Sequence, residues 1–291
     1  MKNKNIKIKK NNKIKSIFSS LLRIIKGVII GLIIGGFLLY LFQDKFIFMP
    51  QDITKITLEY TQRLSGNIEE LNLKTKDGTN LHGWFINNKS NEVTNLLFYF
   101  GGNAEEVSYM VDEFRRYEDW SAVFINYRGY GLSEGSPSEK NLYSDALEIY
   151  DYFLDKREIN NTKIVVMGRS IGTGIATYLA NNRKADGLIL ISPYDSLISV
   201  AQKKFPIYPI NLMVKQKFNS IERAPKIKVH LKIIIASEDQ TIPPWHSKEL
   251  AKKWGGQVDI KEIQGENHNS VSDNEEYWKV IQEFLESFLY P

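Results

Sequence analysis

The chain is 291 residues long, with 43% hydrophobic and 25% charged residues, a balance that is ordinary for a globular protein and excludes wholesale disorder. It contains no cysteine, which excludes disulfide bonds, thiolate metal sites and a cysteine nucleophile. The net charge of +4 is unevenly distributed, because residues 1–26 carry nine basic and no acidic side chains while the remainder carries 29 basic and 34 acidic ones. The mildly acidic body argues against a nucleic-acid groove.

An uncharged apolar segment, residues 27–42, directly follows the basic N-terminal stretch. Together with Gln43 it would form about 25 Å of helix, slightly less than the roughly 30 Å hydrocarbon layer of a membrane. Apolar residues before it can lengthen the span, because Arg23 and Lys26 can snorkel to the headgroups. We therefore predict a basic tail at residues 1–26 and a transmembrane anchor at residues 27–43.

The orientation of this anchor follows from the charge on its N-terminal side. The positive-inside rule keeps the basic tail in the cytoplasm and places the body on the outer side, whether periplasmic, extracellular or lumenal. A cleaved signal peptide is the alternative, but the bulky residues 40–49 contain no small-residue cleavage site. RNA binding by the tail is the other interpretation, and retention of the lysines by the inner leaflet is the simpler one.

Residues 51–291 are predicted to form one domain, because no long linker, repeat or low-complexity stretch follows Pro50. Alternating residues at 68–75 and 80–86 flank a turn sequence, which is typical of a β-hairpin. Further expected strands are residues 96–100, 122–126, 164–167, 188–191, 231–236 and 258–263, and expected helices are residues 104–117, 139–154, 173–181, 244–254 and 274–289. This alternation predicts an α/β fold, with a mostly parallel, doubly wound sheet opened by an antiparallel hairpin.

The loop after the first parallel strand reads Gly-Gly-Asn-Ala-Glu at residues 101–105. In open α/β sheets, sites form outside the carboxyl ends of the strands. Glycines let the backbone approach a substrate, so we expect the N–H of Asn103 to be one donor to an oxyanion. The alternative is a glycine-rich start of a helix without catalytic meaning.

A second glycine-rich loop, residues 126–135, invites comparison with phosphate-binding loops. It lacks the lysine-serine ending of a P-loop, and its glycines miss the dinucleotide-binding spacing. We therefore expect a structural loop that supports the nucleophile turn, with Arg128 in a structural ion pair. Contact of Arg128 with an anionic substrate group is the alternative.

The motif Gly-Arg-Ser-Ile-Gly at residues 168–172 lies directly between the expected strand 164–167 and the expected helix 173–181. A serine on such a strand–turn–helix corner is exposed and is typical of a nucleophile. We predict that Ser170 is this nucleophile and that the N–H of Ile171 is the second oxyanion donor. Because residues 192–230 are longer than a simple connection, we predict a small cap at about residues 193–230 that shapes an apolar acyl pocket. A helical connection packed on the core is the alternative.

A serine nucleophile needs a base, and the chain has four histidines. His268 alone lies in a loop after the last expected strand, where the base of this arrangement belongs. His82 lies within the hairpin, His230 precedes a strand, and His246 opens a helix. We therefore predict His268 as the general base.

The acid that orients the base should follow the penultimate strand, where the chain offers Asp239. The neighbouring Glu238 and the earlier Asp195 are the alternatives. The acid fixes the imidazole tautomer and stabilises the imidazolium without taking up the proton. No His, Asp and Glu cluster has metal-ligand spacing, so neither a metal nor a cofactor is predicted.

Four segments, residues 100–104, 126–131, 168–172 and 265–269, together resemble the membrane-anchored branch of the α/β-hydrolase fold. The resemblance covers about residues 46–289 and departs at Gly101, where many members have histidine. It implies one N-terminal anchor that carries a serine hydrolase, and some members, the acyl-protein thioesterases, remove fatty acyl groups from protein cysteines.

Motifs and resemblance together predict a membrane-tethered serine hydrolase that cleaves ester or thioester bonds, in acylated or lipidic substrates, through an acyl-enzyme on Ser170. The fold alone does not select the substrate, because it serves esterases, thioesterases, peptidases and lipases. A serine peptidase and a catalytically silent scaffold are the alternatives, and the complete triad argues against the scaffold.

Overall fold

The computed structural model describes residues 2–64, 66–88, 95–156 and 162–289, and it divides into two compact units, Met1–Phe46 and Ile47–Pro291. The first unit contains helix α1 (Lys2–Ile47) except for its last residue, which belongs to the second unit. Its segment Ile17–Ile47 is long and apolar enough to cross a membrane, and only 6% of its most apolar window is buried within the protein. Most side chains of the predicted basic tail lie outside the described residues.

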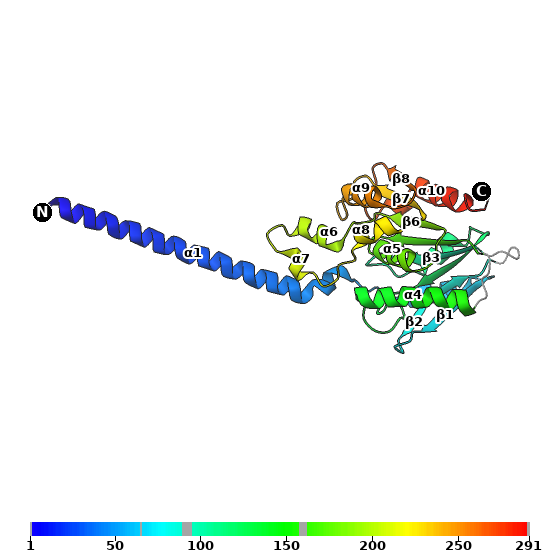
Figure 1. Ribbon diagram of the computed structural model, residues 1–291. Helices are drawn as coiled ribbons and strands as arrows, with labels where there is room; N and C mark the ends of the chain where they lie inside the picture. Colours follow the sequence, from blue (N-terminus) through cyan, green and yellow to red (C-terminus); the bar gives the residue numbers. More distant parts are fainter. Residues whose placement is uncertain (1, 65, 89–94, 157–161, 290–291) are drawn as a thin grey trace. The chain divides into compact units, whose positions relative to one another are not determined.

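The second unit is built on one sheet whose strands, within the described residues, follow the order β1-β2-β4-β3-β5-β6-β7-β8 (Figure 1). The strands are β1 (Ile68–Lys74), β2 (Asn80–Ile86), β3 (Asn95–Phe100), β4 (Trp120–Ile125), β5 (Ile164–Arg169), β6 (Gly187–Ile191), β7 (His230–Ala236) and β8 (Val258–Ile263). Strand β2 pairs antiparallel with both β1 and β4, and all other neighbours are parallel. The predicted mostly parallel sheet with an antiparallel N-terminal hairpin is confirmed.

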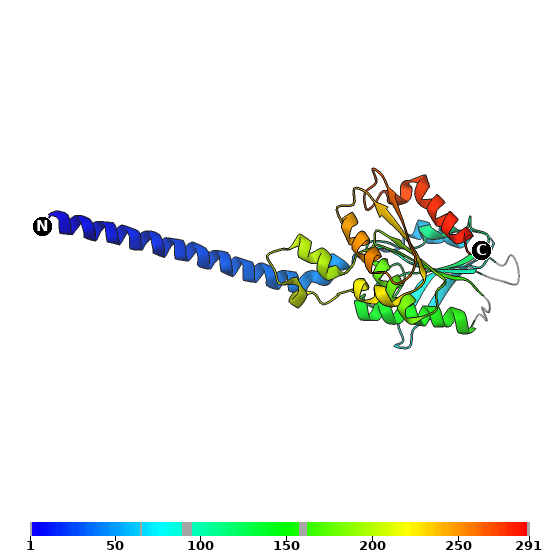
Figure 2. The same cartoon turned by 45° about the horizontal axis from the view of Figure 1, so that its top comes forward.

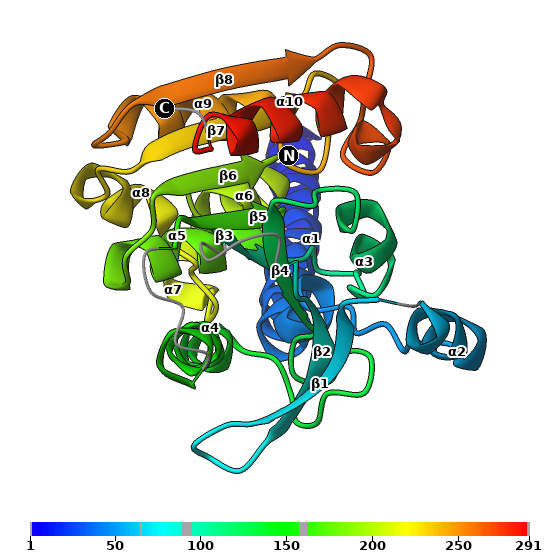
Figure 3. The same cartoon turned by 90° about the vertical axis from the view of Figure 1, so that its right-hand side faces the viewer.

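Helices cover both faces of this sheet, with α3 and α10 on one face and α4 and α5 on the other (Figure 3). The helices of this unit are α2 (Lys55–Arg63), α3 (Tyr109–Phe114), α4 (Glu139–Lys156), α5 (Gly172–Asn182), α6 (Leu197–Lys204), α7 (Ile210–Met213), α8 (Ser220–Arg223), α9 (Pro244–Lys253) and α10 (Glu275–Glu286), with short 3₁₀ turns at Ala224–Lys226 and Val271–Asp273.

The sheet separates two apolar clusters because successive strand side chains point to opposite faces. In β3, Phe98 packs into the cluster beneath α4 and α5, and its neighbour Leu97 packs into the cluster beneath α3 and α10. Both faces are therefore buried, which explains why the central strands are apolar at every position rather than at every second one. This leaves the loops at the carboxyl ends of the strands as the place for a site.

The helix predicted at residues 104–117 is wrong in extent, because α3 covers only Tyr109–Phe114. In a helix that begins at residue 104, the N–H of Val107 would donate to the carbonyl of Asn103. Here it donates to Asn126 Oδ1 at 3.1 Å, and the Asn103 carbonyl accepts from the Tyr130 hydroxyl at 2.7 Å. These bonds replace the first helical turn.

The connection between β6 and β7, the predicted cap at residues 193–230, contains α6, α7, α8 and a 3₁₀ turn. Helices α6 and α7 lie at one end of the second unit, outside the two helical layers (Figures 1 and 2). The N–H of Leu197, at the start of α6, donates to the carbonyl of Lys217 at 3.0 Å. A backbone hydrogen bond thus joins the beginning of this connection to its later part.

Candidate active site

Ser170 occupies the sharp corner between β5 and α5 with φ = 51°, a left-handed conformation that is strained for a residue with a side chain. Glycine is required on both sides of it. A Cβ at Gly168 would lie 2.5 Å from the carbonyl oxygen of Gly172, and a Cβ at Gly172 would lie 2.1 Å from that of Phe100. The glycines of the motif therefore let the strand, the turn and the helix pack closely enough to present Ser170.

The structure brings Ser170, His268 and Asp239 into one hydrogen-bonded row. His268 Nε2 lies 3.0 Å from Ser170 Oγ, and His268 Nδ1 lies 2.6 Å from Asp239 Oδ2. The three residues follow the carboxyl ends of β5, β8 and β7, so the parallel sheet gathers side chains that are far apart in the sequence. Such a row can move a proton from the serine hydroxyl to the imidazole.

Asp239 is buried, and burial raises the pKa of its carboxyl group. The hydrogen bond and charge of His268, together with the N–H of Ile242, outweigh this effect and lower the pKa below its ordinary value. Asp239 is therefore a carboxylate at neutral pH, as an acid that stabilises an imidazolium must be.

The two alternative acids lie elsewhere. Asp195 pairs with a different histidine, because its Oδ1 lies 2.7 Å from His246 Nδ1. Glu238 is exposed to solvent. His246 is completely buried, and its Nε2 has no hydrogen-bond partner among the described residues. The described residues contain a third Asp–His pair, in which His230 Nε2 lies 2.7 Å from Asp259 Oδ2. Of these three pairs, only that of His268 reaches Ser170.

The predicted oxyanion donors lie beside the nucleophile. A Cβ at Gly102 would lie 3.8 Å from Ser170 Cβ, which places the loop at residues 101–105 against the serine. Neither the N–H of Asn103 nor that of Ile171 has an acceptor among the residues that the structure describes. Both groups are therefore available to an oxyanion, the arrangement that acyl transfer requires.

The peptide that carries the Asn103 N–H lies between two peptides that are each fixed by hydrogen bonds. On one side, the Tyr127 hydroxyl donates to the carbonyl of Gly101 at 2.8 Å, and the Gly102 N–H is held by Glu105. On the other side, the Asn103 carbonyl accepts from the Tyr130 hydroxyl at 2.7 Å and from a backbone N–H at residue 49 at 3.0 Å. The protein itself therefore fixes the orientation of the Asn103 N–H.

Tyr127 and Tyr130 belong to the second glycine-rich loop, residues 126–135, and both donate to carbonyls of the loop at residues 101–105. Support of the nucleophile turn by residues 126–135 stays a prediction. Arg128 bonds Asp145 at 2.6 and 2.8 Å and Asp77 at 2.7 Å, and its guanidinium is buried. The prediction that Arg128 forms a structural ion pair is confirmed.

Sequence reasoning missed a buried network around Glu105. Its carboxylate accepts from the hydroxyls of Tyr99 at 2.5 Å and Tyr109 at 3.0 Å and lies 3.5 Å from Arg169 Nη1. Arg169 also donates to the backbone carbonyl of His268 at 3.2 Å. Burial and the charge of Glu105 raise the pKa values of both tyrosines, which stay protonated as donors. The network joins the loop at residues 101–105 to the loop that contains His268.

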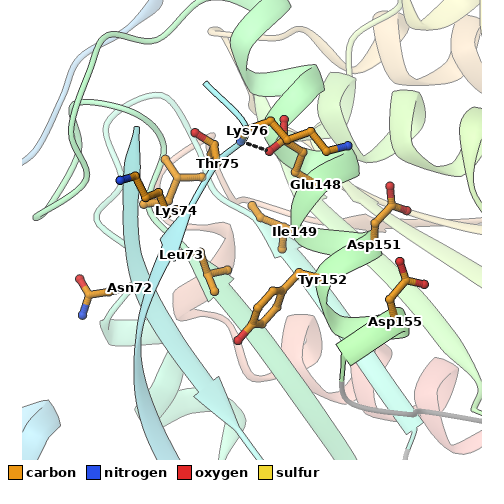
Figure 4. Close-up of a pocket in the computed structure, with 11 residues that line it drawn as sticks. Asn72, Leu73, Lys74, Thr75, Lys76, Glu148, Ile149, Asp151, Tyr152 and Asp155 are labelled. Atoms are coloured by element: carbon orange, nitrogen blue, oxygen red, sulfur yellow. Dashed lines mark hydrogen bonds between the residues drawn. The ribbon is translucent and has the colours of Figure 1, made fainter. Parts of the chain in front are cut away.

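A cavity of about 450 Å³ lies between β1 and α4, and none of the predicted catalytic residues lines it (Figure 4). Its walls include Leu73, Ile149 and Tyr152, at the opposite edge of the sheet order from β7 and β8. It is therefore not the substrate site of Ser170. Among the described residues, no group of three or more His, Asp or Glu side chains could hold a metal ion.

A family model described as the alpha/beta hydrolase fold matches residues 100–278. The chain is 27% identical over 284 residues to an Arabidopsis thaliana protein named alpha/beta hydrolase domain-containing protein WAV2, across 89% of this chain and 92% of that protein. It is 30% identical over 226 residues to an uncharacterized membrane protein of Saccharomyces cerevisiae, across 75% of this chain and 79% of that one.

Solved structures with the same fold include esterases. The Pyrococcus furiosus esterase Pf2001 superposes with a TM-score of 0.67 at 19% identity, across 84% of this chain and 97% of that one. An esterase of Exiguobacterium antarcticum superposes with a TM-score of 0.56 at 17% identity, across 75% and 100% of the two chains. These similarities concern the fold.

Proposed function

Because the chain belongs to the α/β-hydrolase family, we propose that it is a serine hydrolase that cleaves ester or thioester bonds through an acyl-enzyme on Ser170. The observation that carries the proposal is the position of one imidazole. His268 contacts Ser170 Oγ through Nε2 at 3.0 Å and Asp239 through Nδ1 at 2.6 Å, as a general base requires.

In the first half-reaction, Ser170 Oγ attacks the acyl carbon while its proton passes to His268 Nε2. The N–H groups of Asn103 and Ile171 bind the negative oxygen of the tetrahedral intermediate, and each such donor contributes about 10²–10³ in rate. Collapse of the intermediate breaks the bond to the alcohol or thiol, which leaves with the proton from His268. The ionised Asp239 stabilises the imidazolium throughout.

In the second half-reaction, His268 takes a proton from water, and the resulting hydroxide attacks the acyl-enzyme. The same two N–H groups bind the second oxyanion. When this intermediate collapses, Ser170 regains its proton from His268 and the carboxylic acid is released. The two half-reactions therefore return every group to its starting state.

We also propose that Ile17–Ile47 anchors the protein in a membrane. Support comes from its length and apolar composition, from the basic side chains on its N-terminal flank and from the relative named as a membrane protein. By the positive-inside rule, the N-terminus lies in the cytoplasm and the hydrolase unit lies on the outer side. Tethering beside a bilayer favours acylated or lipidic substrates through proximity.

The test uses the full-length chain purified in detergent and a fluorophosphonate probe that reacts with activated serines. We expect labelling of the native protein and none of Ser170→Ala, together with hydrolysis of p-nitrophenyl esters that varies with acyl chain length. No labelling of the native protein would refute the hydrolase proposal and favour a silent scaffold. Faster cleavage of peptide amides than of esters would instead favour a peptidase.

A further inference from the structure

Three large apolar side chains of the cap lie exposed within residues 205–212. Phe205, Ile207 and Leu212 are 38%, 69% and 80% exposed, respectively. Single exposed apolar residues are normal on a soluble protein, but a cluster of them on one short segment marks an interaction surface. This surface therefore requires a partner.

The segment that presents these side chains is ordered by its own hydrogen bonds. The N–H of Ile210 donates to the carbonyl of Tyr208 at 2.9 Å, and the N–H of Val214 donates to that of Ile210 at 2.9 Å. Ile210 itself is buried and fixes the segment to the rest of the unit. The exposed side chains are thus displayed by a defined backbone.

Charge identifies the kind of partner. Residues 196–221 contain four lysines and no acidic residue, although the chain after residue 26 carries more acidic than basic side chains. Lys203, Lys204 and Lys217 are exposed. The carboxylate of Glu139 from α4 reaches this segment but is bonded to the backbone N–H groups of residues 217 and 218. Exposed lysines next to exposed apolar side chains in the sequence are typical of a surface that binds anionic lipid headgroups.

The residues that directly follow the proposed anchor in the chain belong to the second unit and contact this part of it. Phe48 follows the end of the apolar span by one residue, and its ring packs against Phe218 at 6.4 Å between centroids. Met49 donates its N–H to the carbonyl of Asn103 in the oxyanion loop at 3.0 Å. The residues that leave the span are therefore fixed at the edge of the sheet that carries both the cap and Ser170.

We propose that residues 203–217, the docking segment, bind the surface of the anchoring bilayer. The three apolar side chains enter the interfacial region, and the lysines contact anionic headgroups. The inference rests on the proposed function and deepens it, because a docked cap makes Ser170 act on acyl esters or thioesters that reside in the membrane. A short tether raises the local concentration of bilayer, so weak contacts suffice for docking.

Docking is tested directly with a fluorescent label, and the cysteine-free sequence makes a single label site-specific. Leu212→Cys and the control Ile56→Cys, at an 82% exposed position on α2, are labelled with an environment-sensitive dye in the full-length chain. The proteins are reconstituted singly into nanodiscs that contain phosphatidylserine and spin-labelled lipids. We expect quenching at residue 212 and little at residue 56. Equal quenching at residues 212 and 56 would overturn the proposal. Quenching at residue 212 that is absent from nanodiscs with one copy and appears only in nanodiscs with two copies would overturn it as well.

The consequence for catalysis is tested with Ile207→Ser/Leu212→Ser and the control Ile56→Ser in phosphatidylserine-containing vesicles. We expect the double variant to lose roughly tenfold or more of its rate on a long-chain ester embedded in the vesicle, because two apolar contacts are lost. Its rate on water-soluble p-nitrophenyl acetate should be unchanged. Equal rates of the two variants on the embedded ester would overturn the inference while leaving the hydrolase proposal intact. If the native chain hydrolyses neither ester, the hydrolase proposal is refuted. The docking proposal is then still tested by the quenching experiment, which does not depend on turnover.

Discussion

The substitution Asp239→Asn probes the proposed proton path, because the structure determines which way the new amide must point. Asp239 Oδ1 accepts two backbone N–H groups, from Thr241 at 2.9 Å and from Ile242 at 2.8 Å. An amide NH₂ cannot occupy this place, since it would face two donors. The asparagine oxygen therefore stays there, and the NH₂ group takes the place of Oδ2 beside His268.

This orientation reverses the imidazole tautomer. The new NH₂ group donates to His268 Nδ1, where Asp239 Oδ2 accepted at 2.6 Å, so Nδ1 must carry the lone pair. The ring proton then resides on Nε2, which faces Ser170 Oγ and can no longer accept the hydroxyl proton. A wrong tautomer of this kind lowers kcat by about 10⁴ in triads of this type, and we expect a loss of that size with KM little changed.

The assay is steady-state hydrolysis of a water-soluble ester by the full-length chain, with thermal unfolding as a check of folding. The matched control is Asp195→Asn, which alters the buried Asp195–His246 pair. We expect its kcat to stay within about tenfold of the native value, because His246 does not contact Ser170. Asp239 does not orient His268 as proposed if Asp239→Asn keeps more than about a tenth of the native kcat, or if Asp195→Asn loses as much activity as Asp239→Asn.

Three further predictions follow from the packing around the site. Ser170→Gly should abolish fluorophosphonate labelling and raise the free energy of unfolding by about 1 kcal/mol, because glycine relieves the backbone strain at φ = 51°. An unchanged or lower melting temperature contradicts the expected gain in stability. Gly172→Ala should abolish labelling and lower the melting temperature, since the new Cβ would lie 2.1 Å from the carbonyl oxygen of Phe100; a native melting temperature would show that the corner can yield. Arg128→Met should destabilise the protein by about 3–5 kcal/mol at neutral pH with KM unchanged, because it leaves Asp145 buried without its cation. Burial already raises the pKa of Asp145, so the loss of stability in Arg128→Met should shrink as the pH falls and the carboxylate is protonated. Urea unfolding at neutral and mildly acidic pH measures this loss, and a loss that grows in acid contradicts the prediction.

Most of the fold could be predicted from the sequence, because the apolar segments and their order along the chain are local signals. Each expected strand after the hairpin corresponds to a strand within two residues at either end. Once the sheet is parallel, its carboxyl edge determines which loops meet, and Ser170, His268 and Asp239 all lie in such loops. The choice between Asp195 and Asp239 needed coordinates, because both follow strands at this edge and only distances show which histidine each one contacts.

Hydrogen bonds between side chains and backbone groups far along the chain could not be predicted, because they leave no local pattern in the sequence. The bond from Tyr130 to the Asn103 carbonyl joins residues 27 positions apart, and that from Arg169 to the His268 carbonyl joins residues 99 positions apart. Neither has a period or a spacing that a single sequence reveals. The late start of α3 has the same origin, because the Val107 N–H donates to Asn126, 19 positions away, instead of to a helical carbonyl.

Met49 connects the proposed anchor with the proposed chemistry. Its backbone nitrogen lies 3.0 Å from both the Asn103 carbonyl oxygen and the Tyr130 hydroxyl oxygen. Two residues later, the Gln51 carbonyl accepts a hydrogen bond of 2.8 Å from the Gly131 N–H. The segment after the span is therefore part of the support of the oxyanion loop rather than a free linker. A soluble form that begins at Gln51 would lack the Met49 donor and the buried ring of Phe48. Since an oxyanion donor acts through its preset orientation, we expect loss of this segment to lower kcat more than it raises KM in ester hydrolysis.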